Sequence, residues 1–576
     1  MSKIKKIGYG KLWLPLAIVL LLLINGLASL YHARIDLTNE KRFTLSGSTK
    51  TILKNIDDRI QIDVFLKGEF PSGFKKLANS TQETLQEFKE IAGADFQFNF
   101  ISPDETVEGT DVQYGDTLST LGMYPINLKS QLKAGEQQQL VYPVALVRYK
   151  GEVIPVDLYS GNKTFITPAE LNSAEALMEF KFADAINKLS QTSKPMIAYS
   201  TGNGEPGDVR TYDLANNVLL KDYNLKTLNL NTQPFIPDTF KLLIIVKPTQ
   251  AFTDEEKLKI DQFVMRGGKL LIFMDKLEAE LDSLRIKNEV VAYDRNLELN
   301  DLLFKYGARI NNDLVMDLQC DFLPFDINGN GQLEFLHWNY FPLFETKSNH
   351  IINKNVGLVS GRFVNSIDTI EAEGIKKTIL LSSSSNTKTV ATPALISGKE
   401  NVNAPEDESF KKANIPVAVL MEGKFQSLFN NRLPKVMLDS LQDYGIIYQP
   451  QCIVDNKIIV VADGDIVLNS VYKNEPMPMG MNPFTTGSQY EYQFANKEFL
   501  QNCIGYLIDQ SGLLDTKAKE YTLRVLDSKK INAQKNSWQL VNIVLPILVI
   551  IFFAVLYQWW RKRKYTRKYS VPLKTI

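Results

Sequence analysis

The chain has 576 residues, with 65 basic and 65 acidic side chains, and 44% of its residues are hydrophobic. This length allows several domains, and this hydrophobic content is sufficient for packed cores. Lysine and arginine gather at both ends, because residues 1–11 and 561–576 contain basic side chains and no acid. The middle of the chain is therefore net negative. Since such a surface repels phosphate backbones, we expect no nucleic-acid partner.

Cysteine and histidine are scarce. Cys320, Cys452 and Cys503 are widely spaced and form no CxxC pair. They are typical of small buried apolar residues rather than of a disulfide framework. Only three histidines occur, so a multi-histidine metal site is not expected. The composition predicts neither a metal nor a cofactor.

Two apolar stretches, residues 12–30 and 538–560, are long enough to cross a bilayer. Their outer flanks, residues 1–11 and 561–576, are basic and predict cytoplasmic tails at both ends. The protein is then a two-pass protein of the cytoplasmic (inner) membrane with a large periplasmic domain. Gly26, Leu27 and Ala28 imitate a signal-peptidase site. We favour an uncleaved anchor, because the apolar run is longer than a usual signal core.

Residues 31–193 are expected to form an N-terminal α+β domain. Alternating apolar and polar residues predict strands at 60–66 and 96–101, and helical spacing predicts a helix at 74–92 between them. Further strands are predicted at 118–127, 138–149 and 152–158. A helix with Thr167 and Pro168 at its start runs to about residue 190.

Residues 194–375 form the most regular section, the first α/β domain. Strands are predicted at 196–199, 225–230, 241–246 and 269–274, with helices at 209–221 and 253–266. Thr253 and Glu256 form a capping box at the start of the second helix. Strands that alternate with helices predict an open, mostly parallel sheet.

Residues 376–537 repeat this pattern more weakly, as a second α/β region. Strands are predicted at 377–383, 417–422 and 457–462, and helices at 433–441 and 498–510. Residues 383–414 and 474–489 have the composition of long loops. The two regions make either one large domain or two related ones, and both alternatives stay open.

A glycine-rich turn is the first candidate binding site. Thr201, Gly202, Asn203, Gly204 and Glu205 follow a predicted strand and precede a helix, where α/β sheets usually bind ligands. The turn lacks the GxGxxG pattern and a Walker lysine, so it carries no nucleotide fingerprint. The alternative is a tight structural turn.

Asp463 and Asp465 are the second candidate, separated by Gly464 at the end of the strand 457–462. Paired carboxylates can bind a cation or act as acid and base, but DGD is equally a turn. Residues 326–332 imitate a calcium loop, yet His337 occupies the position of the bidentate glutamate, which favours a hairpin turn. The chain contains no GxSxG and no cysteine at a strand-to-helix elbow. Catalysis is therefore not predicted.

Several stretches together resemble one known family over nearly the full length. They are RIDLT at 34–38, KRFTLS at 41–46, STGNGE at 200–205, residues 242–248 and 263–275, DGD at 463–465 and LRVLD at 523–527. The chain resembles the gliding-motility-associated auxiliary components of ABC transporters, the GldG-like family. That family commonly reads TGHGE, and this chain has Asn203 in place of the histidine.

The resemblance implies a non-catalytic substrate- or partner-binding subunit that works with a separate permease and a separate cytoplasmic ATPase. It also implies glutamine-amidotransferase-like sheets without the nucleophile. Gliding motility or envelope secretion would be the process served. The basic tail 561–576 fits contact with anionic membrane lipid. Two rival hypotheses are a membrane-anchored hydrolase that uses Glu205, Asp463 and Asp465, and an envelope scaffold.

Overall fold

The structure is a computed structural model. It describes residues 13–30, 44–107, 109–132, 135–159, 166–191, 193–280, 289–326, 330–345, 349–397, 407–509, 511–518 and 528–566. The tail 1–11, the RIDLT motif, the LRVLD motif and the end of the basic tail lie outside these residues. The chain divides into two compact units, Met1–Tyr521 and Thr522–Ile576.

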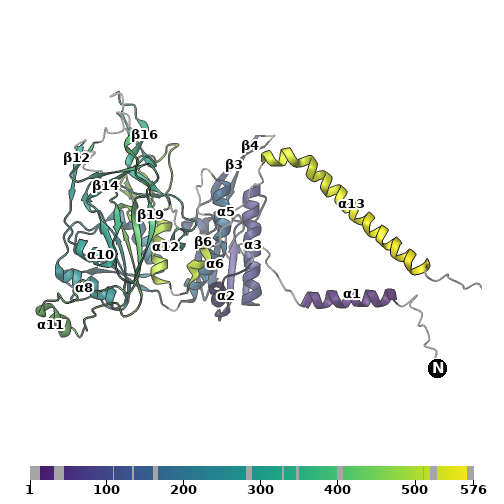
Figure 1. The fold of residues 1–576 in the computed structure, drawn as a ribbon, viewed down its shortest axis with the longest axis horizontal. Coiled ribbons are helices and arrows are strands. Elements are labelled where there is room, and N and C mark those ends of the chain that lie inside the picture. The colour runs from purple at the N-terminus through teal and green to yellow at the C-terminus, as the bar shows by residue number, and fades with distance from the viewer. Residues whose placement is uncertain are drawn as a thin grey trace, which may run out of the picture. The chain divides into compact units, whose positions relative to one another are not determined.

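The N-terminal α+β region is built on a four-stranded sheet of order β2-β1-β5-β6 (Figure 1). Strands β1 (Ile60–Val64) and β2 (Phe96–Phe100) are parallel and are joined by α3 (Ser72–Ala92). Strands β5 (Val144–Tyr149) and β6 (Glu152–Asp157) form an antiparallel hairpin. Its core includes Ile62, Leu85 and Phe182. The predicted β-α-β opening is confirmed.

Three predictions in this region need correction. Residues 118–127 are not one strand, because Leu118 is buried within α4 (Tyr114–Thr120) and β3 (Ile126–Leu132) starts later. Residues 138–149 divide between β4 (Gly135–Val141) and β5, with Pro143 in the break. The helix from Thr167 is two helices, α5 (Pro168–Ala176) and α6 (Met178–Ser190), which meet at Leu177.

A seven-stranded sheet of order β19-β22-β23-β10-β9-β7-β8 forms the centre of the α/β region. Five strands are parallel, namely β7 (Met196–Thr201), β8 (Asn224–Asn229), β9 (Phe240–Val246), β10 (Lys269–Phe273) and β23 (Asn456–Val461). Strands β22 (Pro416–Gly423) and β19 (Ile375–Ser382) continue it in antiparallel fashion. Strands from both expected α/β regions therefore share one sheet.

Helices cover both faces of this sheet. One face packs against α8 (Asp254–Met265) and α10 (Asn300–Tyr306). The other packs against the π-helix η2 (Asp213–Leu219) and α12 (Asn496–Ile508). Alternate residues of the central strands enter the two cores, as in a buried parallel sheet.

A β-rich section that the sequence pattern did not predict lies between β10 and β22. Its hairpin of β15 (Cys320–Phe325) and β16 (Glu334–Phe344) rises at one end of the region (Figure 1). Strands β20 (Thr387–Ala391) and β21 (Ala394–Ser397) fall inside the predicted loop 383–414. Asp326 accepts hydrogen bonds from the backbone amides of Asn330 and Gly331, in keeping with a turn.

The smaller elements complete the chain. They are α2 (Gly47–Lys54), η1 (Val209–Thr211), α7 (Leu220–Asp222), β11 (Leu277–Glu278), β12 (Glu289–Asp294), β13 (Ala308–Ile310), β14 (Asp313–Asp317), η3 (Ile351–Asn353), β17 (Val359–Ser360), β18 (Ile367–Thr369), η5 (Asp407–Ser409), α11 (Lys435–Asp443), η6 (Asp465–Val467), β24 (Val471–Tyr472), β25 (Glu475–Pro476) and η7 (Leu513–Ala518). All three cysteines are free and buried, as predicted.

Each terminal apolar stretch forms a helix, α1 (Trp13–Leu30) and α13 (Ser528–Thr566). Within the described part of the chain, one helical segment, Trp538–Lys564, is long and apolar enough to cross a membrane. None of its apolar window is buried inside the protein. A second span at residues 12–30 stays a prediction.

Candidate functional site

The carboxyl edge of the seven-stranded sheet brings four chain segments together. The chain passes from β7 to β8 on one side and then returns across β7 to β9 on the other. Such a reversal creates the position where open α/β sheets bind ligands. Residues 202–205 follow β7, which ends at Thr201, and Lys247 follows β9. Asp275 lies beyond β10, and Asp463 to Asp465 lie beyond β23.

The glycine-rich turn is closed by its own side chains. Glu205 folds back to accept hydrogen bonds from Ser200 Oγ (2.7 Å) and from the backbone amide of Asn203 (2.8 Å). Gly204 has a φ of 78°, and a Cβ there would lie 2.0 Å from Thr249 Oγ1. The backbone amides of Thr249 and Gln250 both donate to Asn203 O at 2.9 Å. These contacts support the structural-turn interpretation.

Asn203 sits at the position where the resembled family has histidine, and its side chain is buried. Its Nδ2 donates to Glu256 Oε2 at 3.2 Å, which ties the turn to the start of α8. Glu256 also completes the predicted capping box with Thr253. Within the described residues, Asn203 Oδ1 and Glu256 Oε1 have no hydrogen-bond partner. A donor at this point, such as a histidine N–H, would satisfy an acceptor that is otherwise costly to bury.

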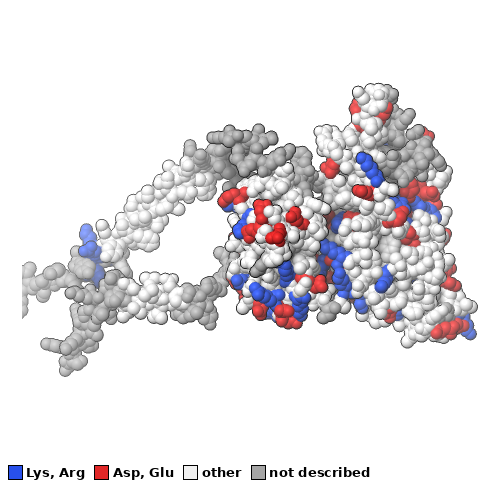
Figure 2. All heavy atoms as spheres, turned by 180° about the vertical axis from the view of Figure 1, so that it is seen from behind, with Lys and Arg blue, Asp and Glu red and all other residues white. Residues whose placement is uncertain are grey.

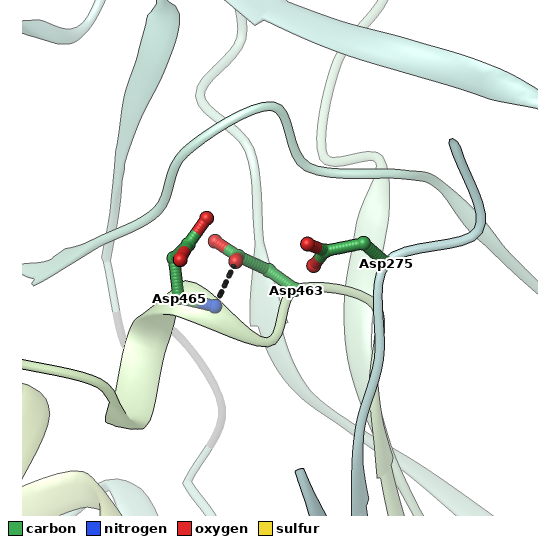
Figure 3. A group of neighbouring side chains, drawn as sticks. All are labelled: Asp275, Asp463 and Asp465. Atoms are coloured by element: carbon green, nitrogen blue, oxygen red, sulfur yellow. Dashed lines mark hydrogen bonds between the residues drawn. The ribbon is translucent and has the colours of Figure 1, made fainter. Parts of the chain in front are cut away.

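Three carboxylates converge next to this turn. Oxygens of Asp275, Asp463 and Asp465 lie within 4.8 Å of one another, and Figure 3 shows the three carboxylate groups side by side. Asp463 accepts hydrogen bonds from the backbone amides of Asp465 (2.7 Å) and Arg362 (2.8 Å). Asp275 accepts one from the backbone amide of Gly464 (2.6 Å).

Lys247 supplies the positive charge for this group. Its Nζ lies 2.7 Å from Asp465 Oδ1, 3.2 Å from Asp275 Oδ2 and 3.3 Å from Glu280 Oε2. Its side chain is only 5% exposed, so the ion pairs are screened little by solvent. Carboxylate oxygens suit Ca²⁺ or Mg²⁺, but here the lysine ammonium contacts two of the three aspartates. A metal ion would have to compete with it.

The protonation of the group follows from burial and charge. Burial alone would lower the pKa of Lys247, but Asp275, Asp465 and Glu280 raise it above its usual range. Burial, reinforced by the charges of Asp275 and Asp465, raises the pKa of Asp463 well above its usual value. Burial would also raise the pKa of Asp465, yet Lys247 and Arg362 hold it below its usual value. Burial raises the pKa of Asp275 despite the opposing charge of Lys247.

The structure therefore brings together some of the predicted site residues and leaves others apart. Asp463 and Asp465 lie together, joined by Asp275 and Lys247, whereas Glu205 is bonded within its own turn. The two candidates meet through the loop after β9, which carries both Lys247 and the Thr249 amide that bonds Asn203. Sequence reasoning missed Lys247 and Asp275. Both directly follow predicted buried strands, a signal that could have found them.

Comparisons with known proteins give the following likenesses. A family model described as an ABC-type uncharacterized transport system matches residues 194–503, which hold this sheet and site. A second model, a domain of unknown function, matches residues 39–148. An uncharacterized protein of Borreliella burgdorferi is 22% identical over 567 residues, covering 96% of this chain and 98% of its own length.

Solved structures give weaker likenesses. The mmIFT52 N-terminal domain matches with a TM-score of 0.30 and 14% identity, over 55% of this chain and 97% of that chain. PurLQS from Thermotoga maritima matches with a TM-score of 0.22 and 9% identity, over 55% and 99%. TM-scores this low carry no argument about fold or function.

Proposed function

Because the chain belongs to the family described as an ABC-type uncharacterized transport system, whose model matches more than half of it, we propose that it is a non-catalytic accessory subunit of an ABC transporter complex. Its α/β region would bind a substrate or an envelope partner. A separate permease and a separate ATPase would complete the complex. The nucleophile-free glutamine-amidotransferase-like sheet and the link to gliding motility or envelope secretion belong to this proposal.

The observation that carries the non-catalytic role is the placement of Lys247. Enzymes with open α/β sheets place reactive groups at this edge. Here Asp275 and Asp463 are buried, and Lys247 forms ion pairs with Asp275 and Asp465. Backbone amides from Arg362, Gly464 and Asp465 satisfy the aspartate oxygens further. A network of this kind holds strand ends together and leaves few polar atoms for a substrate.

The membrane arrangement supports a subunit that depends on partners. The apolar segment of α13 ends in Arg561, Lys562, Arg563 and Lys564, which favour a cytoplasmic position. With a first span at residues 12–30, both tails would lie in the cytoplasm and the α/β region in the periplasm. ATP hydrolysis would then have to occur in another subunit.

Copurification tests the complex directly. The full-length chain, carrying an affinity tag, is extracted from native membranes in a mild detergent that preserves other membrane complexes. We expect a permease and an ATPase to copurify in fixed ratio. A chain that lacks residues 528–566 serves as the matched control and should lose both. Recovery of the full-length chain alone would contradict the proposal.

Topology is tested separately by cysteine labelling. The native cysteines are buried, so an impermeant maleimide reads only an introduced cysteine. We expect Thr110→Cys, on an exposed residue of the globular region, to react in cells whose outer membrane is opened. Ser2→Cys should react only after the inner membrane is broken. Labelling of Ser2→Cys in intact inner membranes would rule out a cytoplasmic N-terminus.

One observation favours the hydrolase alternative. Asp463 and Asp465 are close, and their pKa values shift in opposite directions, as in a pair that serves as acid and base. Glu205, however, does not join them. This alternative predicts a hydrolytic activity that Asp463→Asn abolishes without loss of folding. A scaffold instead predicts that deletion of the β15–β16 hairpin tip leaves function intact.

A further inference from the structure

A large cavity lies at the opposite, amino edge of the sheet. Its volume is about 1640 Å³, and its walls come from α6, the starts of β9, β10 and β23, and α12. Apolar side chains such as Val218, Tyr223 and Leu507 share these walls with many lysines. Figure 2 shows lysine and arginine gathered between the N-terminal α+β region and the α/β region, which both belong to the unit Met1–Tyr521.

The acids and lysines of this cavity differ in how they are paired. Asp184 and Asp222 both bind Lys188 at 2.8 Å. Glu170 accepts from the Thr167 amide in the capping box of α5, and Asp509 accepts from the amides of Ser511 and Leu513. Local structure therefore uses these four carboxylates. Glu498, another acid of the cavity wall, acts on Lys181 and Lys517.

Lys269, Lys457 and Lys517 lack such partners. Within the described residues, no carboxylate lies within ion-pair distance of any of the three. Lys269 Nζ donates to Asn456 Oδ1 at 2.6 Å, and Lys517 Nζ donates to Asn502 Oδ1. Lys457 Nζ lies 3.7 Å from the centre of the Tyr506 ring. The neutral partners of Lys269 and Lys457 orient these two ammonium groups but do not cancel their charge. Lys517 differs, because the charges of Asp184 and Glu498 act on it from within the same cavity.

Sheet register places two of these charges side by side. Leu270 is paired with Ile458, so Lys269 lies opposite Lys457 at the start of adjacent parallel strands. On its other side Lys457 is paired with Glu422, whose carboxylate accepts a hydrogen bond from Tyr506 Oη at 2.6 Å. Both side chains project from the α12 face, since the next residues on that face, Leu271 and Ile459, belong to its core. Two positive charges on adjacent strands repel each other. Partial burial strengthens this repulsion, because less water surrounds the charges. Burial and the charge of Lys457 both lower the pKa of Lys269.

The carboxyl end of α12 explains only part of this arrangement. Lys457 Nζ lies 3.4 Å from Tyr506 O in the last turn of that helix, a favourable position for a cation. Lys269 and Lys517 make their hydrogen bonds to side-chain amides instead. We propose that this cavity binds a multivalent anion, with phosphate or carboxylate groups held between Lys269 and Lys457. The inference goes beyond the proposed accessory role and does not depend on it.

Calorimetry on the full-length chain in detergent micelles tests this site, with sodium pyrophosphate and sodium citrate as probes at fixed ionic strength. We expect saturable binding of at least one probe and about tenfold weaker binding to Lys269→Gln, because the glutamine keeps a hydrogen-bond donor but removes one charge of the pair. The matched control is Lys411→Gln, an exposed lysine outside the cavity, which should bind like the unchanged chain. No saturable binding by either probe, or equal affinity in Lys269→Gln, would overturn the proposal.

Thermal unfolding without the probes adds a second readout. If Lys269 serves an anion, Lys269→Gln relieves repulsion and the midpoint stays the same or rises. A clear fall would mean that Lys269 is structural and would count against the site. If a short-chain phosphatidic acid competes with pyrophosphate, the natural ligand is assigned to a lipid headgroup. If it does not compete, the ligand is assigned to a soluble anion. Copurification does not enter these measurements, so failure of the anion site and failure of the complex are distinguishable.

Discussion

Lys247 is the cation in ion-pair contact with Asp275 and Asp465 at the carboxyl edge. Lys247→Met keeps the apolar stem but leaves the buried Asp275 and the half-buried Asp465 without their ion-pair partner. Removing one partner of a buried ion pair typically costs about 3–5 kcal/mol, so we expect a loss of that order in the free energy of unfolding. Denaturant unfolding followed by circular dichroism measures it.

Arg309→Met is the matched control for Lys247→Met. Arg309 pairs with Asp368, and both side chains are about half exposed. Exposed pairs contribute about 0–1 kcal/mol, so the control should change stability little. Equal losses in the two variants would show that Lys247 does not act through buried charge.

Gly204 tests the glycine-rich turn. Gly204→Ala must adopt a φ of 78° and place its Cβ 2.0 Å from Thr249 Oγ1. We expect a loss of about 1–3 kcal/mol, since strain of this kind has that cost. Gly207→Ala is the control, because no atom lies within 4 Å of its Cβ and its φ is not in the left-handed region. If Gly204→Ala is as stable as the unchanged chain, the loop after β9 that carries Thr249 must move aside at little cost.

Lys517 gives a pH-dependent prediction. Burial lowers its pKa from 10.5 to about 8, with Lys181 and Lys188 acting in the same direction and Asp184 and Glu498 opposing. Between these values the folded protein binds fewer protons than the unfolded chain, so its stability rises with pH from about 8 to 10.5. Lys517→Met should remove this rise and be more stable than the unchanged chain at pH 7. Unfolding midpoints measured from pH 7 to 10.5 test both effects.

At the scale of elements, the sequence predicted those helices and strands that are marked by local patterns, such as apolar runs and capping residues. The apolar runs of β9 and β10 predicted buried strands, and the capping box predicted at Thr253 is present. Thr167 and Pro168 start a helix as predicted, with a capping box to Glu170 that was not predicted. The β-rich section was missed because its strands pair over long separations, as β14 does with β20. The strand predicted at 118–127 was wrong for a different reason. Leu118 is the buried residue of the short helix α4, and one buried residue gives no helical periodicity to recognise.

Thr253 provides a prediction for one element. Its hydroxyl accepts from the Glu256 amide, and Glu256 in turn accepts from Asn203. Thr253→Ala should cost about 1 kcal/mol, because it removes the cap of α8. Thr253→Ser keeps the hydroxyl and should restore most of that stability, as thermal unfolding can show. If serine fails to rescue, the methyl group rather than the cap is responsible.

At the scale of the molecule, the candidate site required tertiary structure. Asp463 and Asp465 were visible in the sequence, but Asp275 comes from another strand and Arg362 from the β-rich section. Their meeting depends on strand order, which places β10 between β9 and β23. Sequence alone left open whether the two α/β regions form one domain or two related ones, and gave no strand order across them. The pairing of β23 with β10 places strands of both regions in one sheet, and each strand would otherwise expose an unpaired edge.

The division into two units leads to a final prediction about solubility. The apolar segment of α13 has no buried residue, and the globular cores lie within residues 44–518. A chain of residues 44–518 should therefore fold without detergent and unfold at the midpoint of the full-length protein, because it loses no core residue. Size-exclusion chromatography and thermal unfolding measure this. The full-length chain, which carries an apolar segment of 27 residues, should require detergent. A lower midpoint or aggregation of the shorter chain would show that the terminal helices contribute to the folded core.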